Sequence, residues 1–246
     1  MASPIGAFAE ELVDFIEHFF GWLLTLFSDI LDLVLDFVGS ILTYLDPIIF
    51  IPVLVIVSLL ITKRLFMSLL IGAAFYIIYW MGYWNSAMAT LNMVLVATLV
   101  AVVLAVPLGI WAADSEKANP VIKALMDFMQ TMPAFVYLIP AVIFFGLGVV
   151  PGVVATVIFA MPPVVRLTNL GIRQVPPEMN EVADAFGSTG WQKLTKVQMP
   201  IAMPSIMAGI NQCIMLSLSM VVIAAMIGGG GLGGDIVYAL SRIDVA

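Results

Sequence analysis

The sequence has 246 residues, of which 63% are hydrophobic and only 10% are charged, and its formal net charge is -7. Soluble domains contain roughly half apolar and a quarter charged residues, so this composition excludes an ordinary soluble enzyme and predicts an integral membrane protein. With one cysteine the chain cannot form an intrachain disulfide, and His18, the single histidine, has no second histidine or cysteine near it in the sequence for a zinc site.

The N-terminal segment, residues 1–46, differs from the rest in charge. It holds eight of the sixteen acidic residues, all of which precede the first lysine or arginine. Apolar residues recur there at helical spacing with most aspartates opposite, the pattern of an amphipathic helix. Acidic residues are too frequent for a spanning helix, so we expect one or two helices flat on the outer membrane surface, with Gly21 or Gly39 as candidate breaks. Packing against other protein is the alternative.

Residues 47–246 form the predicted membrane domain. A helix needs about 20 apolar residues to cross about 30 Å of hydrocarbon, and several apolar stretches approach or exceed that length. Short polar segments separate them. The sequence therefore predicts an all-α, polytopic membrane protein with about six spanning helices, at 47–62, 65–84, 86–113, 132–149, 152–172 and 204–227.

Basic residues orient these segments, because cytoplasmic loops carry an excess of Lys and Arg. If Lys63 and Arg64 face the cytoplasm, alternation of the spans places eight of the nine basic residues inside and only Arg242 outside. The acidic N-terminal segment then lies outside. Arg166 falls in the fifth span, one or two turns from its cytoplasmic end, so we expect its side chain to extend toward the interface.

One cytoplasmic loop is long enough to hold structure of its own. Two prolines suit a helix start, Gly187 permits a tight reversal, and residues 191–197 form a second short amphipathic helix that Pro200 would end. The loop therefore predicts a helical hairpin at 178–197. An apolar helical face in the cytosol is typical of a surface that docks into a partner's groove.

The spacing in this hairpin resembles the EAA loop of ABC-importer permeases. Glu181, Ala183, Gly187 and Pro200 fall at the family's positions, and valine or methionine replaces its usual alanine, isoleucine and leucine at 182, 197 and 199. In that family the loop is the coupling helix, which sits in a cleft of the ATPase subunit. The resemblance implies that Glu181 is a helix-end contact, Ala183 allows close approach and Gly187 makes the turn. The implied coupling set is Glu181, Ala183, Asp184, Gly187, Trp191 and Pro200.

Two further segments, 127–140 and 161–173, resemble permeases for glycine betaine, proline betaine and related quaternary amines. The resemblance covers about 91–232 and implies the ABC importer type I permease fold in a bacterial or archaeal cell (inner) membrane. It also implies a second copy of the chain, two cytoplasmic ATPase subunits that bind ATP and Mg²⁺, a separate or fused external substrate-binding protein, and no nucleic acid or cofactor on this chain. Such permeases usually have a further spanning helix, so we expect the natural chain to continue beyond Ala246.

Several polar and aromatic residues in or near the spans are candidates for the translocation pathway or its gate. Each of them could instead pack against or hydrogen bond a neighbouring helix. An aromatic cage would suit a trimethylammonium group, but the resemblance assigns the high-affinity cage to the binding protein. The candidates are Gln130, Thr131, Pro133, Phe135, Tyr137, Asn169 and Asn211.

Nucleotide motifs are also informative. The glycine-rich segment 228–234 satisfies GxGxxG, but it follows a membrane helix instead of joining a strand to a helix, and no GxxxxGKS or GxxxxGKT occurs. ATP hydrolysis is therefore expected on another chain. The sequence predicts a permease subunit, without its own ATPase site, that moves a quaternary amine by alternating access. An ATP-independent channel or secondary transporter is the alternative, although few acids lie in the spans for ion coupling.

Overall fold

The computed structural model describes residues 4–242, with the backbone alone for residues 4–10 and 12. All elements of the described chain are helices, which is the expected solution for a membrane chain whose backbone groups must be satisfied internally. They are α1 (Pro4–Thr43), α2 (Pro47–Thr62), α3 (Leu65–Trp80), α4 (Trp84–Asp114), α5 (Ala118–Thr131), α6 (Ala134–Phe145), α7 (Val149–Arg173), α8 (Pro177–Ala185), α9 (Gly190–Lys193), the π-helix η1 (Leu194–Gln198), α10 (Met199–Ala225) and α11 (Gly231–Arg242).

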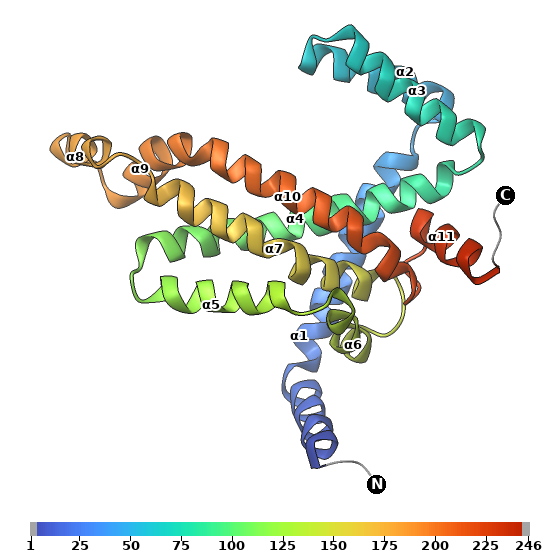
Figure 1. Ribbon diagram of the computed structural model, residues 1–246, viewed down its shortest axis with the longest axis horizontal. Coiled ribbons are helices and arrows are strands. Elements are labelled where there is room, and N and C mark those ends of the chain that lie inside the picture. The colour runs from blue at the N-terminus through green and yellow to red at the C-terminus, as the bar shows by residue number, and fades with distance from the viewer. Residues whose placement is uncertain (1–3, 243–246) are drawn as a thin grey trace.

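The three long helices α4, α7 and α10 lie side by side and form the centre of the molecule (Figure 1). Small residues let them approach closely, as in other membrane bundles. A Cβ placed on Gly109 of α4 would lie 2.6 Å from Cβ of Thr168, and one on Gly209 of α10 would lie 3.1 Å from Cα of Val164, both on α7. Helix α7 is therefore the element on which the other two pack.

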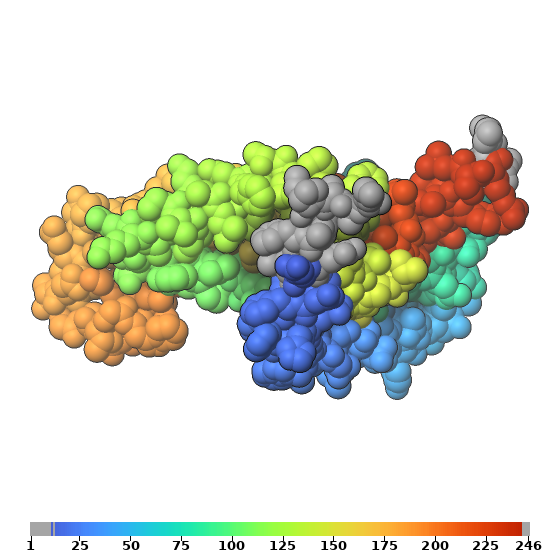
Figure 2. Space-filling model, turned by 90° about the horizontal axis from the view of Figure 1, so that it is seen from below, coloured from blue at the N-terminus to red at the C-terminus, as the bar shows by residue number. Residues whose placement is uncertain are grey.

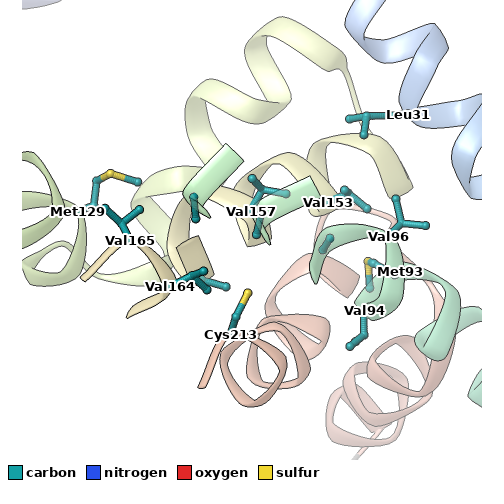
Figure 3. Packing of buried hydrophobic residues seen from close by; sticks show 14 of the residues in the cluster. Leu31, Met93, Val94, Val96, Met129, Val153, Val157, Val164, Val165 and Cys213 are labelled. Atoms are coloured by element: carbon teal, nitrogen blue, oxygen red, sulfur yellow. The ribbon is translucent and has the colours of Figure 1, made fainter. Parts of the chain in front are cut away.

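The core between these helices is apolar. Valines of α7, including Val157 and Val164, meet Met93 and Val96 of α4 and Cys213 of α10 (Figure 3). Cys213 is fully buried and unpaired with another cysteine, and it packs in the core as a small hydrophobic residue.

Judged by helix length and apolar composition, the structure has fewer candidate spanning helices than the six that the sequence predicts. Among the described residues, three helices are long and apolar enough to cross a membrane, at Trp84–Asp114, Val149–Arg173 and Gly190–Ala225. The number rises to five if each of two bent pairs makes one span. One pair joins α1 to α2 at 93°, and the other joins α5 to α6 at 99°. Helix α3 has 16 residues, about 24 Å at 1.5 Å per residue, and is shorter than the predicted 65–84.

The predicted span 132–149 is wrong as a single helix. Residues predicted as a polar loop begin α5, and the chain bends sharply at Met132 and Pro133 before α6. Pro133 has no N–H, so the carbonyl of Met129 lacks its usual helical donor. The hydroxyl of Tyr137 donates to that carbonyl instead. Helix α6 then ends at Gly146, whose φ of 76° lies in a region that favours glycine.

Helix α1 is one continuous helix, so neither Gly21 nor Gly39 breaks it. It runs crosswise to α4, α7 and α10 (Figure 1) and buries Leu31 and Leu35 against the bundle. The side-chain amide of Asn92 on α4 donates to the carbonyl of Leu35 at 3.0 Å. One face of α1 therefore packs against protein, as the alternative expectation for this segment stated.

The remaining faces of α1 divide by polarity. Asp29, Asp32 and Asp36 are exposed on one side, whereas Leu26, Leu33 and Phe37 are exposed on another. An exposed apolar stripe beside an exposed acidic stripe is the arrangement of a helix at a membrane interface. The predicted amphipathic character is thus present in the fold.

Helices α2 and α3 form a hairpin that stands away from the central bundle (Figure 1). The side chain of Asp46 accepts from the N–H of Ile48 and starts α2, which matches the predicted 47–62. The hairpin meets the bundle through an aromatic cluster in which Trp84 of α4 contacts Phe50 and Phe75. Most of its apolar surface is exposed, as expected for helices in contact with lipid or another chain.

Candidate functional site

A helical hairpin projects from one end of the bundle, opposite to the end that carries α11 (Figures 1 and 2). It consists of α8, α9 and η1 and lies between α7 and α10 in the chain. Its position agrees with the predicted hairpin at 178–197. We call the end of the bundle that carries this hairpin the hairpin end.

The turn of the hairpin depends on Gly187, whose φ is 74°. Its N–H donates to the carbonyl of Asp184 at 2.9 Å, and the N–H of Ser188 donates to the carbonyl of Ala183 at 3.0 Å. These bonds close the C-terminus of α8 as in other glycine-terminated helices. A Cβ at position 187 would meet no atom within 4 Å, so the backbone conformation, and not space, requires glycine.

Three polar contacts fix the two arms of the hairpin. Asp184 and Lys193 form an ion pair with an Oδ1–Nζ distance of 2.8 Å. Thr189 and Gln192 form a capping box at the start of α9. The amide of Gln198 in η1 donates to Asn180 of α8 at 3.1 Å. Of the predicted coupling residues, Asp184 thus acts within the hairpin itself.

The outer surface of the hairpin is apolar. Met179, Val182 and Phe186 follow one face of α8 at helical spacing, and Phe186 is 86% exposed. Trp191 of α9 is 72% exposed. We call these four residues the hairpin tip. Exposed large apolar side chains gathered on a short projecting element mark an interaction surface.

The predicted coupling residues occupy different places. Glu181 is exposed on α8, whereas Ala183 is 5% exposed and is the buried residue of that helix. The expectation that Pro200 ends a helix is wrong. Residues Gly190–Ala225 are one continuous helix, because the π-turn at η1 shifts the hydrogen-bond register and Met199 N–H donates to Leu194 O.

Five of the predicted pathway residues gather at the bend between α5 and α6. Gln130 and Thr131 are exposed at the end of α5, and Pro133 caps α6. Phe135 is exposed, but Tyr137 is buried and bonded to Met129. The hydroxyl of Tyr137 therefore joins α6 to the end of α5 across the bend, and its role in the pathway stays a prediction.

The other two pathway candidates lie apart from this bend. Asn169 of α7 donates to Asn119 of α5 at 2.7 Å and accepts from Arg173. Asn211 is exposed on α10. Among the described residues, no hydrogen bond joins either side chain to the group at the α5–α6 bend.

Sequence reasoning missed a polar connection between α5 and α7. Nη2 of Arg166 lies 2.6 Å from Oδ1 of Asp127, and the expectation that Arg166 extends toward the interface stays a prediction. The two groups form a charge-assisted hydrogen bond across 39 positions of the chain. The pair could not be found from local spacing, unlike the capping box of Thr189, which the Thr-x-x-Gln pattern indicates.

No group of three or more His, Cys, Asp or Glu side chains that could hold a metal ion occurs in the part of the chain that the structure describes. The hairpin end is therefore characterised by contacts between helices and by charged side chains, and its described residues form no cluster of metal ligands.

Comparisons with known proteins agree with these features. Residues 105–246 match the family described as binding-protein-dependent transport system inner membrane component. The glycine betaine/carnitine transport permease protein GbuB of Listeria monocytogenes is 48% identical over 98% of this chain and 86% of that protein. The glycine betaine transport system permease protein OpuAB of Bacillus subtilis is 46% identical over 94% of this chain and 84% of that protein.

Solved structures give the same fold. A chain of the MetNI methionine ABC transporter in an inward-facing conformation matches with a TM-score of 0.60 and 19% identity, over 64% of this chain and 79% of that chain. At this identity the likeness concerns the fold, which is that of an ABC-importer permease. Taken with the family match and the two relatives, it leads to one conclusion: this chain belongs to the family of inner membrane permease components of binding-protein-dependent transport systems, and it is not itself the ATPase.

Proposed function

We propose that the chain is the membrane-spanning subunit of an ATP-driven importer for glycine betaine or a related quaternary amine. The observation that carries the coupling to ATP is the hairpin, which presents an exposed apolar tip beyond the ends of α7 and α10. The substrate class rests on the relatives, whose names specify glycine betaine with or without carnitine.

The hairpin tip suits a groove on an ATPase subunit. A short amphipathic helix binds through apolar side chains at positions i, i+3 and i+7, which is the spacing of Met179, Val182 and Phe186. In this proposal Glu181 contacts the ATPase from the polar side of α8. Ala183 and Gly187 keep the two arms close enough to move as one body.

The working assembly contains two copies of this chain, two cytoplasmic ATPase subunits with ATP and Mg²⁺, and an external binding protein. ATP-driven closure of the ATPases pulls the two hairpins together. Because the second arm is continuous with α10 through η1, the displacement passes directly into the bundle. The bend between α5 and α6, with Gln130, Thr131, Pro133 and Phe135, is the proposed gate.

The proposed orientation places residues 1–46 on the outer membrane surface, whereas the transmembrane domain 47–246 presents its hairpin at 178–197 to the cytoplasm. Eight of the nine basic residues lie in the segment 117–196 and at Lys63 and Arg64, in keeping with the positive-inside rule. The acidic stripe of α1 then avoids the anionic inner leaflet.

The test uses the purified permease with its ATPase subunits and binding protein in proteoliposomes. We expect uptake of radiolabelled glycine betaine with ATP inside, and none without it. Flux that needs no ATP would favour the channel or secondary transporter and overturn the proposal. Uptake of other solutes with ATP, but not of a quaternary amine, would overturn the substrate assignment alone.

A crosslinking experiment tests the docking surface separately. Cys213 is fully buried, so a cysteine introduced by Phe186→Cys is the reactive one. We expect it to crosslink to the ATPase subunit, whereas Tyr238→Cys, exposed on α11 at the opposite end, should not. Equal crosslinking by both variants, or none from position 186, would contradict the assignment of the hairpin tip.

A further inference from the structure

A pocket of about 310 Å³ lies between α5 and α7 near the hairpin end. The two helices lie side by side (Figure 1), and the pocket follows the groove between them from Arg173 toward Arg166. These positions are seven residues apart, about 10 Å along a helix axis. The volume is at the lower end of the range of about 300–1,000 Å³ that is usual for small-ligand sites.

Three cations line this pocket, namely Lys123, Arg166 and Arg173, whereas none of its lining residues is Asp or Glu. Arg173 donates only to neutral oxygens, those of Asn169 and Ala112. Lys123 forms no salt bridge with any residue that the structure describes. The charge of two of the three cations is therefore not neutralised by the protein.

Arg166 adds a second observation. Its ion pair with Asp127 uses Nη2, but its Nε is buried and has no hydrogen-bond acceptor among the described residues. Buried donors in folded proteins nearly always find a partner, and an unsatisfied guanidinium donor is especially unfavourable. A planar guanidinium with an unused donor is suited to an anionic oxygen of a bound ligand.

Apart from Asn119 and Asn169, the rest of the pocket lining is apolar. Ile122 and Met126 of α5 face Val165 and Leu170 of α7. Cations that line a largely apolar groove between membrane helices match an amphiphile with an anionic headgroup and an acyl chain. A small soluble anion would use the cations but would leave the apolar lining without a partner.

We infer that this pocket binds the phosphate headgroup of an anionic phospholipid from the cytoplasmic leaflet. Lys123 and Arg173 hold the charge, Nε of Arg166 donates to a phosphate oxygen, and the first part of an acyl chain covers the apolar lining. The leaflet rests on the orientation given under Proposed function. Because the ligand would contact both α5 and α7, it would stabilise the connection between the gate and the helix that leads to the hairpin.

The experiment measures lipid binding by native mass spectrometry on the complete permease complex. Phosphatidylglycerol, phosphatidylcholine and inorganic phosphate are the probes. We expect the complex to retain phosphatidylglycerol in preference to phosphatidylcholine, and Lys123→Gln to weaken the retention about fivefold, the usual effect of one cation near a membrane surface. Lys117→Gln is the matched control because Lys117 is exposed and does not line the pocket. Lys123→Arg should restore binding.

Each other outcome overturns the inference. Equal retention of phosphatidylglycerol by Lys123→Gln and Lys117→Gln would show that the pocket does not bind the lipid headgroup. Equal retention of both lipids would assign the site to acyl chains alone. Displacement of lipid by millimolar inorganic phosphate would make a soluble anion the ligand. Failure of the transport proposal is distinguishable, since it would abolish ATP-driven uptake while the lipid preference remained.

Discussion

Asp184 of α8 and Lys193 of α9 lie on opposite sides of the Gly187 turn and form an ion pair at 2.8 Å. The pair is the only salt bridge between the two arms in the part of the chain that the structure describes. It links residues of a hairpin whose outer face is apolar. The angle between the arms therefore depends on this ion pair and the Gln198–Asn180 hydrogen bond together with the glycine turn.

Breaking this pair should have a small effect on stability. The Asp184 side chain is 57% exposed, and exposed pairs contribute about 0.2–1 kcal/mol in double-mutant cycles. We expect Asp184→Asn and Lys193→Gln to be non-additive by about that amount in thermal unfolding of the detergent-solubilised complex. The exchange Asp184→Lys with Lys193→Asp should recover most uptake lost by either reversal alone. An exchange no better than the single reversals would argue against the pair.

Replacement of Gly187 should uncouple ATP hydrolysis from transport. A φ of 74° is unfavourable for residues with a Cβ by about 1–2 kcal/mol, and a β-branched residue is worse. We expect Gly187→Val to insert normally but to abolish betaine uptake and substrate-stimulated ATPase activity. Gly190→Ala is the control, because Gly190 begins α9 and is not at positive φ. Normal transport by Gly187→Val would remove the coupling assignment.

The contact between α4 and α7 should be intolerant of a side chain at Gly109. A Cβ there would lie 2.6 Å from Cβ of Thr168 and 2.8 Å from the carbonyl oxygen of Val165. We expect Gly109→Val to destabilise the chain by about 1–3 kcal/mol or more through overpacking, seen as a lower melting temperature in detergent. Gly21→Ala, where no atom lies within 4 Å, should leave the melting temperature unchanged or raise it. Equal melting of both variants would contradict the close packing.

The hydroxyl of Tyr137 should stabilise the bend between α5 and α6. Pro133 leaves the carbonyl of Met129 without a backbone donor, and Tyr137 supplies one. Removal of one hydrogen bond lowers stability by about 0.5–1.5 kcal/mol, so Tyr137→Phe should melt at a lower temperature. Tyr76→Phe is the control, since Tyr76 is exposed and its hydroxyl makes no hydrogen bond within the described chain. If the two variants melt alike, the bond does not hold the bend.

Trp191 should matter for assembly and not for folding. Its side chain is 72% exposed, and substitutions at such positions usually change stability by less than about 0.5 kcal/mol. Exposed tryptophans at interfaces are often binding hot spots, worth about 2 kcal/mol or more. We expect Trp191→Ala to keep its melting temperature but to bind the ATPase subunits about 30-fold or more weakly, measured by titration of the two purified components. Unchanged affinity would place Trp191 outside the interface.

Local sequence properties predicted much of this molecule. Hydropathy marked the helices because a bilayer accepts only backbone whose polar groups are satisfied internally, and 47–62 matches α2 residue for residue. The hairpin was readable because Gly187, the prolines and the Thr189 capping box are signals that act within a few residues. The failure at 132–149 has a local cause as well. Pro133 was visible, but the 99° bend that followed from it was not.

The sequence by itself determined the membrane class, the helical content and the position of the hairpin formed by α8, α9 and η1, because hydrophobicity, glycine and proline act on the chain nearby. Only the tertiary structure decided that α1 packs crosswise through Leu31 and Asn92, and that Tyr137 turns inward. It also brought Arg166 and Asp127 together across 39 positions and so created the cationic pocket between α5 and α7. Such contacts join residues distant in sequence, and helical periodicity carries no information on which faces of different helices meet.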